Sequence, residues 1–285
     1  MLPINAVESM GMIVANLDRS IDFYTTILSF QKVSDRQVSG GEIDKLYGLS
    51  DVQLRIAQLQ LGEQLLELTE FITPKGRVIP VDSRSNDRWF QHIAIVVREM
   101  EPAYQHLQDH RVSQISPSPQ TLPAWNPVAG GIQAFYFKDP DGHNLELIYF
   151  PAGKGDPKWH NSTAPVFLGI DHTAIVVANT AISRAFYCDL LGMKLHQESE
   201  NYGSEQEQLS GISNAKVKIS SLKTTAGLGI ELLEYLEPTS GRSIPSDSRL
   251  NDIWSYQTTI TIKDSLSSIQ QLTIDPDGHI IKLIQ

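Results

Sequence analysis

The sequence predicts an α+β fold made of four βαβββ modules, because the chain repeats itself and strand-like and helix-like segments alternate in each repeat. The segment GRVIPVDSRSNDRW (76–89) recurs as GRSIPSDSRLNDIW (241–254), and residues 14–16 (VAN) recur at 177–179. The offset between copies grows from 163 to 165 residues, as two small loop insertions would produce. A chain of 285 residues is also long for one ordinary domain. We therefore expect a duplicated protein whose halves each divide into two modules.

A strand-like apolar run opens each of the first three modules, at Met10–Ala15, His92–Val97 and His172–Val177. Three further strands are expected to close each module, as Val52–Leu59 and Gln64–Phe71 do in the first. Short apolar runs bounded by turn residues are typical of strands.

A short helix is expected after the opening strand of a module. In the third module, apolar residues recur at helical spacing over Ala181–Leu191. Asn179 or Thr180 can cap its first turn, and Gly192 can adopt the left-handed conformation that ends it. Met100–His110 is the matching helix of the second module.

The polar, proline-flanked segment 156–165 (DPKWHNSTAP) indicates a linker, so we predict domains at 1–155 and 166–285, each of two modules. The fourth module is short. From His92 to Asp139 there are 47 residues, but from Gln257 to the matching Asp275 only 18. This module is either truncated or lacks a segment of the sequence.

Composition excludes several classes of protein. The 23 basic and 33 acidic residues give a net charge of −10, which disfavours binding to nucleic acid phosphates. The single cysteine, Cys188, cannot form an internal disulfide and is expected to be a small buried side chain. Neither a signal peptide nor a membrane-spanning apolar run is visible, so we expect a soluble cytoplasmic protein with no membrane partner.

The motif DPDGH occurs twice, at 139–143 and 275–279, and its proline, glycine and aspartates are typical of a turn. In the first copy the turn leads into an apolar strand that contains Glu146. A carboxylate in an apolar strand needs solvent or a partner, so Glu146 is either exposed or bound to something.

These features together resemble the vicinal oxygen chelate superfamily, which includes glyoxalase I, extradiol dioxygenases, fosfomycin-resistance enzymes and bleomycin-binding proteins. The resemblance covers nearly the whole chain. It rests on the module order, the first-strand pattern His-x-x-Ile-x-Val (172–177), the Phe-Tyr pair on the following helix and DPDGHNLEL (139–147). It implies glyoxalase-like cupped barrels, each made by two modules, with metal ligands from the first strand and a later strand of each module.

The resemblance also implies which modules pair. Similar single-chain glyoxalase I proteins with four modules pair the inner two with each other and the outer two with each other. Under that pairing the inner modules offer a complete set of two histidines and two carboxylates: His92, Glu146, His172 and Glu231. The outer modules offer an incomplete set at the matching positions: Ser9, Glu67, Gln257 and Lys282. We expect Glu67 and Lys282 to form an ion pair in place of a metal.

The inner set suits a divalent metal ion, namely Zn²⁺, Ni²⁺, Co²⁺ or Fe²⁺. We predict a metal-dependent lyase or isomerase of the glyoxalase type. It would bind a small substrate through two adjacent oxygens and stabilise an enediolate. Glu146 would be the general base, and Glu231 is the second choice for this role. The alternatives are an iron-dependent extradiol-type dioxygenase and a metal-free small-molecule binding or resistance protein. Because the usual dimer is already fused, the chain is expected to be a monomer.

Other positions carry more limited expectations. Glutathione is doubtful as a co-substrate, because Val176 and Tyr235 stand where glyoxalase I has an arginine and an asparagine that hold it. Glu70 and Glu234 are competing carboxylates, but they are expected on the opposite faces of their strands. The repeated segment 76–89 is interpreted as a connector held by Asp–Arg and Asn side-chain bonds. The segment with Gly130-Gly131 is either a lid or an ordinary loop.

Overall fold

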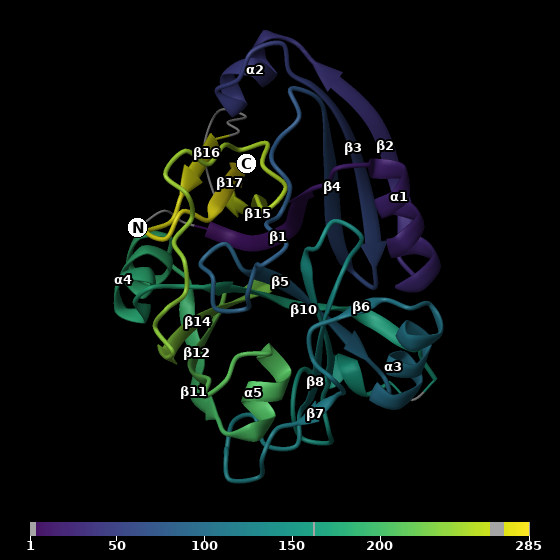
Figure 1. The fold of residues 1–285 in the computed structure, drawn as a ribbon, viewed down its shortest axis with the longest axis vertical. Helices are drawn as coiled ribbons and strands as arrows, with labels where there is room; N and C mark the ends of the chain where they lie inside the picture. Colours follow the sequence, from purple (N-terminus) through teal and green to yellow (C-terminus); the bar gives the residue numbers. More distant parts are fainter. Residues whose placement is uncertain (1–3, 162, 263–270, 285) are drawn as a thin grey trace.

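The computed structural model describes residues 4–161, 163–262 and 271–284, whose strands form two open sheets (Figure 1). The outer sheet combines the first and fourth modules. Its strands, in spatial order, are β16 (Gln271–Ile274), β17 (Ile280–Ile284), β15 (Tyr256–Ile262), β1 (Ile4–Ile13), β4 (Gln64–Thr73), β3 (Gln53–Leu61) and β2 (Gln31–Ser39), with β13 (Ala226–Gly227) also paired to β1.

The inner sheet combines the second and third modules. Its strands, in spatial order, are β11 (Lys194–Tyr202), β12 (Lys216–Lys223), β14 (Gly229–Glu237), β10 (Phe167–Val176), β5 (Gln91–Val97), β9 (Asn144–Tyr149), β8 (Gln133–Lys138) and β6 (Ser113–Gln114), with β7 (Gln120–Thr121) also paired to β8.

The predicted pairing of modules, inner with inner and outer with outer, is therefore confirmed. The inner modules join through antiparallel pairing of β5 with β10, and the outer modules join through antiparallel pairing of β1 with β15. The α+β class is confirmed, while the two sheets are not closed into barrels. Each sheet takes strands from both halves of the chain, and the division at 156–165 stays a prediction.

Helices follow the opening strands as the sequence predicts. The helical segments are α1 (Leu17–Asp22) with η1 (Phe23–Ile27), α2 (Gly41–Tyr47), α3 (Met100–Asp109), η2 (Pro157–His160), α4 (Thr180–Arg184) with η3 (Ala185–Leu190), and α5 (Ser204–Ser210). Asn179 caps α4 by accepting from the amides of residues 181 and 182, and Gly192 has φ 85°. No helix among the described residues has the length and apolar character of a membrane span.

The helices α2 and α5 were not expected. Each is short and packs over one face of a sheet. Each ends at a glycine in the left-handed conformation, Gly48 (φ 63°) and Gly211 (φ 67°). These glycines repeat at the offset of the duplication, so the repeated Gly after a polar stretch was the available signal for both helices.

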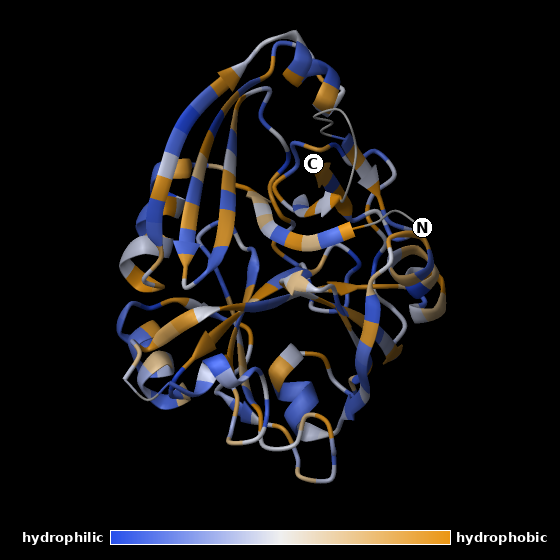
Figure 2. Ribbon diagram, turned by 180° about the vertical axis from the view of Figure 1, so that it is seen from behind, coloured by the Kyte–Doolittle hydropathy of each residue, from blue (hydrophilic) through white to orange (hydrophobic). Residues whose placement is uncertain are grey.

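One apolar core joins the two sheets on one face of their strands. On β5, Ile93, Ile95 and Val97 belong to this core, and His92 lies on the opposite face because side chains alternate along a strand. We call the face of the inner sheet that carries His92 and His172 the inner cup. The corresponding face of the outer sheet, with Ser9 and Gln257, is the outer cup. At the far edge of the outer sheet, β2 is mostly exposed and largely hydrophilic (Figure 2).

The fourth module is short in the structure as well. Here β16 lies beside β17 as β8 lies beside β9 in the second module. No strand is described between β15 and β16, whereas β6 and β7 stand between β5 and β8. The helix expected in this module falls in residues 263–270, outside the described residues.

The two repeated connectors, 76–89 and 241–254, bind each other reciprocally. Arg77 donates to Asp252 (Nη2–Oδ2 2.7 Å), and Arg242 donates to Asp87 (2.6 Å). Each guanidinium also lies over a tryptophan of the other connector. The interpretation as a connector held by Asp–Arg bonds is confirmed, although the bonds run between the two copies. Hydrogen bonds to charged groups are among the stronger stabilising interactions of a protein.

The DPDGH turns fasten each inner module to its outer neighbour in the sequence. Asp141 accepts from the amide of Ala15 (3.0 Å), and Tyr24 of the Phe-Tyr pair donates to Asp139 (3.3 Å). The second copy repeats both bonds at the matching positions: Asp277 to Ala178 and Asp275 to Tyr187. The motif thus joins the two sheets, since β1 belongs to one and β9 to the other.

We predict that Asp252→Asn lowers the free energy of unfolding by about 2 kcal/mol at pH 7, because a buried carboxylate that accepts from Arg77 is lost. The bonds from Arg77 and Arg249 outweigh burial and lower the pKa of Asp252. Its stabilisation is therefore present above pH ~4 and disappears as the pH falls through the lowered pKa. Urea denaturation at several pH values measures this difference. Asp247→Asn is the control, since Asp247 binds the same arginine on the surface. Equal losses in both variants would contradict the prediction.

A second prediction concerns the crossing of the connectors. A Cβ on Gly241 would lie 1.8 Å from the carbonyl oxygen of Asn86, so Gly241→Ala should destabilise the protein by about 2–3 kcal/mol. A Cβ on Gly41 meets nothing within 4 Å, so Gly41→Ala should be neutral or slightly stabilising. Chemical denaturation of both variants compares them. An unchanged free energy of unfolding in the Gly241→Ala variant would contradict the close contact between Gly241 and Asn86.

Candidate metal centre

The four residues of the inner set come from four neighbouring strands: His92 from β5, Glu146 from β9, His172 from β10 and Glu231 from β14. The register explains their convergence. Ala174 pairs with both His92 and Glu231, and Ala94 pairs with both His172 and Glu146. The two carboxylates therefore flank the two histidines on one face of the sheet.

The side chains of this set are in contact. Oε2 of Glu146 lies 3.2 Å from Nε2 of His92 and 3.6 Å from Nε2 of His172. Oε2 of Glu231 lies 3.4 Å from Nε2 of His172. Ligand atoms of His92, Glu146 and His172 all lie within 4.8 Å of one another. These three form a compact group, and Glu231 adjoins it through His172.

His92 is buried without a hydrogen bond on either ring nitrogen. Its contact with Glu146 is close in distance but lacks the geometry of a hydrogen bond. A buried imidazole normally satisfies its polar nitrogens, so this one needs a further partner. Nitrogen and carboxylate oxygen ligands around such a point fit Zn²⁺, Ni²⁺, Co²⁺ or Fe²⁺.

His172 is oriented by a chain of bonds that the sequence did not predict. Its Nδ1 contacts Oδ2 of Asp171 at 3.0 Å, and Trp159 donates from Nε1 to the other oxygen of Asp171 at 2.9 Å. This arrangement points Nε2 of His172 toward the carboxylates and matches the carboxylate–histidine pairs found behind metal ligands. Trp159 lies in η2, within the predicted linker, which therefore contributes to the site.

Three carboxylates surround His172 and favour positive charge there. Burial disfavours a charged imidazole, but Glu231, Asp171 and Glu146 outweigh burial and raise the pKa of His172 to about 9. Burial likewise opposes ionisation of Asp171, but the bond with His172 lowers the pKa of Asp171 to about 2. A divalent cation would provide positive charge at the same point, so the electrostatics also fit a metal.

Two tyrosines lie beside the inner set, and neither was a predicted site residue. Tyr136 pairs with Glu146 across β8 and β9, and its ring centroid lies 5.0 Å from that of His92. Tyr235 stands four residues after Glu231 on β14. Burial, followed by the nearby Glu146, raises the pKa of Tyr136 well above its ordinary value. Side chains alternate between the two faces of β8 and β14, and this alternation in the sequence could have predicted that both tyrosines lie on the face of the set.

The helix α5 and a loop of the second module cover the inner cup. Leu209 of α5 packs in one apolar cluster with Tyr136 and Tyr235. The loop containing Gly130-Gly131 is tied to β11, because Asn126 donates to Asn201 at 2.7 Å. This loop fastens the second module to the third, and its role as a lid stays a prediction.

The outer cup holds the expected ion pair. Nζ of Lys282 lies 3.4 Å from Oε1 of Glu67, and both side chains are largely buried. Lys282 occupies the position of Glu146, so a fixed ammonium stands where the inner cup has a ligand carboxylate. Glu70 and Glu234, the competing carboxylates, instead accept from amides at the starts of α1 and α4.

The remaining acidic and histidine clusters are structural. Asp139, Asp141 and His143 lie close enough together to hold a metal ion. However, His143 contacts Asp139 through Nδ1 (2.9 Å) and donates through Nε2 to the carbonyl oxygen of Ile253 (2.8 Å). With both ring nitrogens engaged, His143 cannot be a ligand without losing these bonds.

Comparison with known proteins places this arrangement in a family. The model of the Glyoxalase/Bleomycin resistance protein/Dioxygenase superfamily matches residues 6–147 and 169–244, which include all four residues of the inner set. A 2-epi-5-epi-valiolone epimerase from Actinomyces sp is 32% identical over 156 residues, which span 52% of this chain and 81% of that protein.

Two solved structures share the whole fold. Glyoxalase I from Zea mays has a TM-score of 0.59 and 17% identity, covering 100% of this chain and 92% of that one. A Bacillus subtilis protein provisionally described as a dioxygenase has a TM-score of 0.57 and 11% identity, covering 100% and 86%. At these identities the likeness concerns the fold alone. The family match and the duplicated fold agree, and the chain belongs to the glyoxalase/bleomycin resistance protein/dioxygenase superfamily.

Proposed function

We propose that this protein is a metal-dependent isomerase that moves a proton on a carbon next to a carbonyl, in a small substrate with adjacent oxygens. The observation that carries the proposal is the placement of Glu146 and Glu231 on either side of the buried His92–His172 pair. Two carboxylates in this arrangement can serve two faces of one substrate carbon.

The inner set would hold the metal through His92, His172, Glu146 and Glu231. A bound divalent ion supplies Lewis acidity, which polarises the substrate carbonyl and makes the adjacent proton easier to remove. Asp171 and Trp159 keep the imidazole of His172 oriented. Glu146 is almost fully buried and contacts both histidines, whereas Glu231 contacts one and is more exposed. Glu231 is therefore freer to exchange a proton with substrate.

The epimerase relative favours isomerisation over the other reactions of the family. An epimerase inverts one stereocentre, which next to a carbonyl requires removal of a proton from one face and return to the other. A flanking pair of bases suits this demand. Glutathione is not part of the proposal, because the buried Val176 and Tyr235 stand at the positions of the arginine and the asparagine that hold it in glyoxalase I.

We predict that His92→Ala and His172→Ala abolish stoichiometric metal binding and activity, because each removes a ligand. Asp171→Asn should weaken metal affinity roughly 10–100-fold while the ligands remain. Elemental analysis of protein purified without chelator, followed by competitive zinc titration, measures both effects.

Ser9→Ala and Gln257→Ala are the matched controls, since these residues occupy the same positions in the outer cup. Both controls should keep the full metal content. Circular dichroism establishes that each variant is folded. Retained metal in His92→Ala and His172→Ala would refute the assignment of the site.

A further prediction separates the roles of the carboxylates. Glu231→Gln should lower kcat for epimerisation by about 10²–10⁴-fold, since one of two proton carriers is lost. Exchange of the substrate proton with solvent deuterium should persist for the epimer served by Glu146. Proton NMR in D₂O with 2-epi-5-epi-valiolone and dihydroxyacetone as probes measures exchange and inversion separately. Loss of both by the same factor would point to a single base.

A dioxygenase is the second candidate, because His92, His172 and Glu146 alone form the compact group of ligand atoms. Two histidines and one carboxylate are the ligands of non-heme iron oxygenases. Anaerobic loading with Fe²⁺, followed by oxygen uptake with catechol, tests this candidate. Oxygen uptake without deuterium exchange would replace the isomerase proposal.

A further inference from the structure

A cavity of about 250 Å³ lies where the inner sheet, the first connector and the end of α5 meet. We call it the mouth cavity and define it by Arg84, Ser85, Lys138, Asn144 and Ser210, which contribute to its lining. The connector residues 83–85 form one side, and Ser210 with the following glycine forms another. This cavity is not explained by the metal-binding residues.

The mouth cavity is next to the metal centre along the strands. Lys138 pairs with Asn144 across β8 and β9, two residues along from the pair of Tyr136 with Glu146. Side chains two residues apart share a face and lie about 7 Å apart. Asn144 is also the partner of His92 on β5. A small molecule held at the histidines can therefore extend toward Lys138.

The lining is positively charged in a chain with a net charge of −10. Lys138 and Arg84 line the cavity, and no aspartate or glutamate does so among the described residues. The guanidinium of Arg84 donates to the carbonyl oxygen of Ser240 (3.3 Å) and lies 3.9 Å from the carboxylate of Asp87. Lys138 forms no ion pair in the described part of the chain, although it also borders a second cavity that contains Asp139 and Asp141. The remaining polar groups are hydroxyls and amides, which donate hydrogen bonds to anions.

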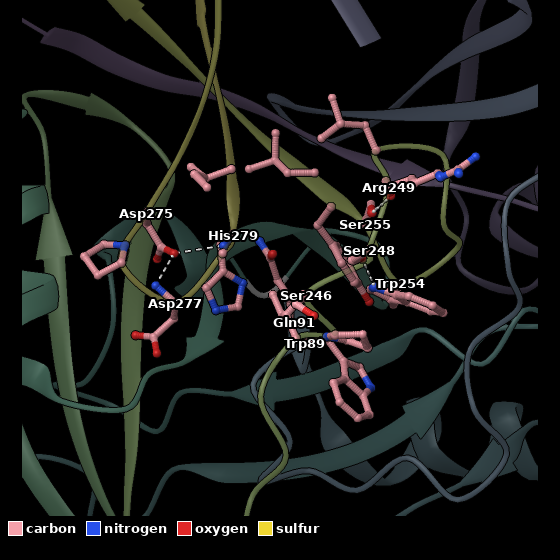
Figure 3. A pocket seen from close by; sticks show the side chains of 18 residues that line it. Trp89, Gln91, Ser246, Ser248, Arg249, Trp254, Ser255, Asp275, Asp277 and His279 are labelled. Carbon is pink, nitrogen blue, oxygen red and sulfur yellow. Dashed lines mark hydrogen bonds between the residues drawn. The ribbon is translucent and has the colours of Figure 1, made fainter. Parts of the chain in front are cut away.

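The outer cup differs from the inner cup at these cavity positions, as it does at the four candidate ligand positions. The residues matching Lys138, Asn144 and Ser85 are Ile274, Ile280 and Leu250. The corresponding outer cavity, of about 370 Å³, is lined by these apolar residues and also by Arg249, Asp275 and Asp277, which Figure 3 labels. The two aspartates match Asp139 and Asp141, which line the neighbouring inner cavity beside Lys138. Lys138, Asn144 and Ser85 thus lie beside the cup with two histidines, and apolar residues stand at the matching positions beside the other cup.

We propose that the mouth cavity binds an oxyanion group, a phosphate or a carboxylate, carried by a substrate held at the metal centre, since Lys138 and Asn144 lie two residues along β8 and β9 from Tyr136 and Glu146. This proposal rests on the proposed function, since it assigns the anionic group to the substrate of that reaction. Lys138 and Arg84 supply the charge, while Asn144 and Ser85 offer hydrogen-bond donors. The substrate would then be a small α-hydroxyketone that carries a phosphate or carboxylate group.

Calorimetric titration of the full-length protein, metal-free and zinc-loaded, tests the proposal with glycerol 3-phosphate, glycerate and glycerol. At least one of the two anions should bind more tightly than glycerol, and Lys138→Met should weaken that binding roughly 10-fold or more. Arg84→Met should weaken it as well. Arg249→Met is the matched control, since Arg249 is the counterpart of Arg84 at the outer cavity, and it should change nothing. Equal binding of glycerol, or an unaffected Lys138→Met variant, overturns the proposal.

A second measurement locates the anion. In protein loaded with Mn²⁺, paramagnetic relaxation of the ³¹P signal of glycerol 3-phosphate should place phosphorus beyond direct coordination of the metal. A distance of about 3 Å would put the phosphate on the metal and overturn the proposal. If the protein binds the anion through Lys138 but holds no metal, the proposed function fails and the anion site stands.

Discussion

The antiparallel pairing of β5 with β10 is the contact on which the inner cup depends. It joins the second and third modules and places His92 and His172 diagonally across one face. The parallel neighbours β9 and β14 then bring Glu146 and Glu231 to the same face. Because side chains alternate along a strand, a register shift of one residue would turn one histidine toward the apolar core between the sheets. Packing of that core therefore protects the ligand geometry.

The duplication explains which parts of the sequence stayed alike. The connectors and the DPDGH turns make reciprocal bonds, Arg77 with Asp252 and Arg242 with Asp87, so a change in one copy disrupts the contact of both. The ligand positions have no such reciprocity, because each cup uses its own residues. The residues at these positions can therefore differ between the cups without disturbing the fold, as His92 and His172 differ from Gln257 and Ser9.

The sequence predicted the fold and the convergence of His92, Glu146, His172 and Glu231 on one face, because repeats and motif spacing record the order of strands and the faces of their side chains. It did not predict the roles of Asp171 and Trp159. A residue beside His172 and a tryptophan in a polar linker show no periodic signal, and their bond exists only after η2 folds back on β10. Tyr136 was missed similarly, since its proximity to Glu146 depends on the pairing of β8 with β9. What the sequence lacked was information on contacts between elements.

The two cups neutralise buried carboxylates in different ways. In the outer cup, the side chain of Lys282 pairs with Glu67 at 3.4 Å, so the protein itself supplies the partner of this carboxylate. In the inner cup, Glu146, Glu231 and Asp171 surround His172, and a proton on that imidazole offsets only part of their charge. Burying unbalanced carboxylates is costly, which makes a divalent ion the natural counterpart of this set. Lys282 thus stands where the inner cup has the carboxylate of Glu146, and it supplies the cation that pairs with Glu67.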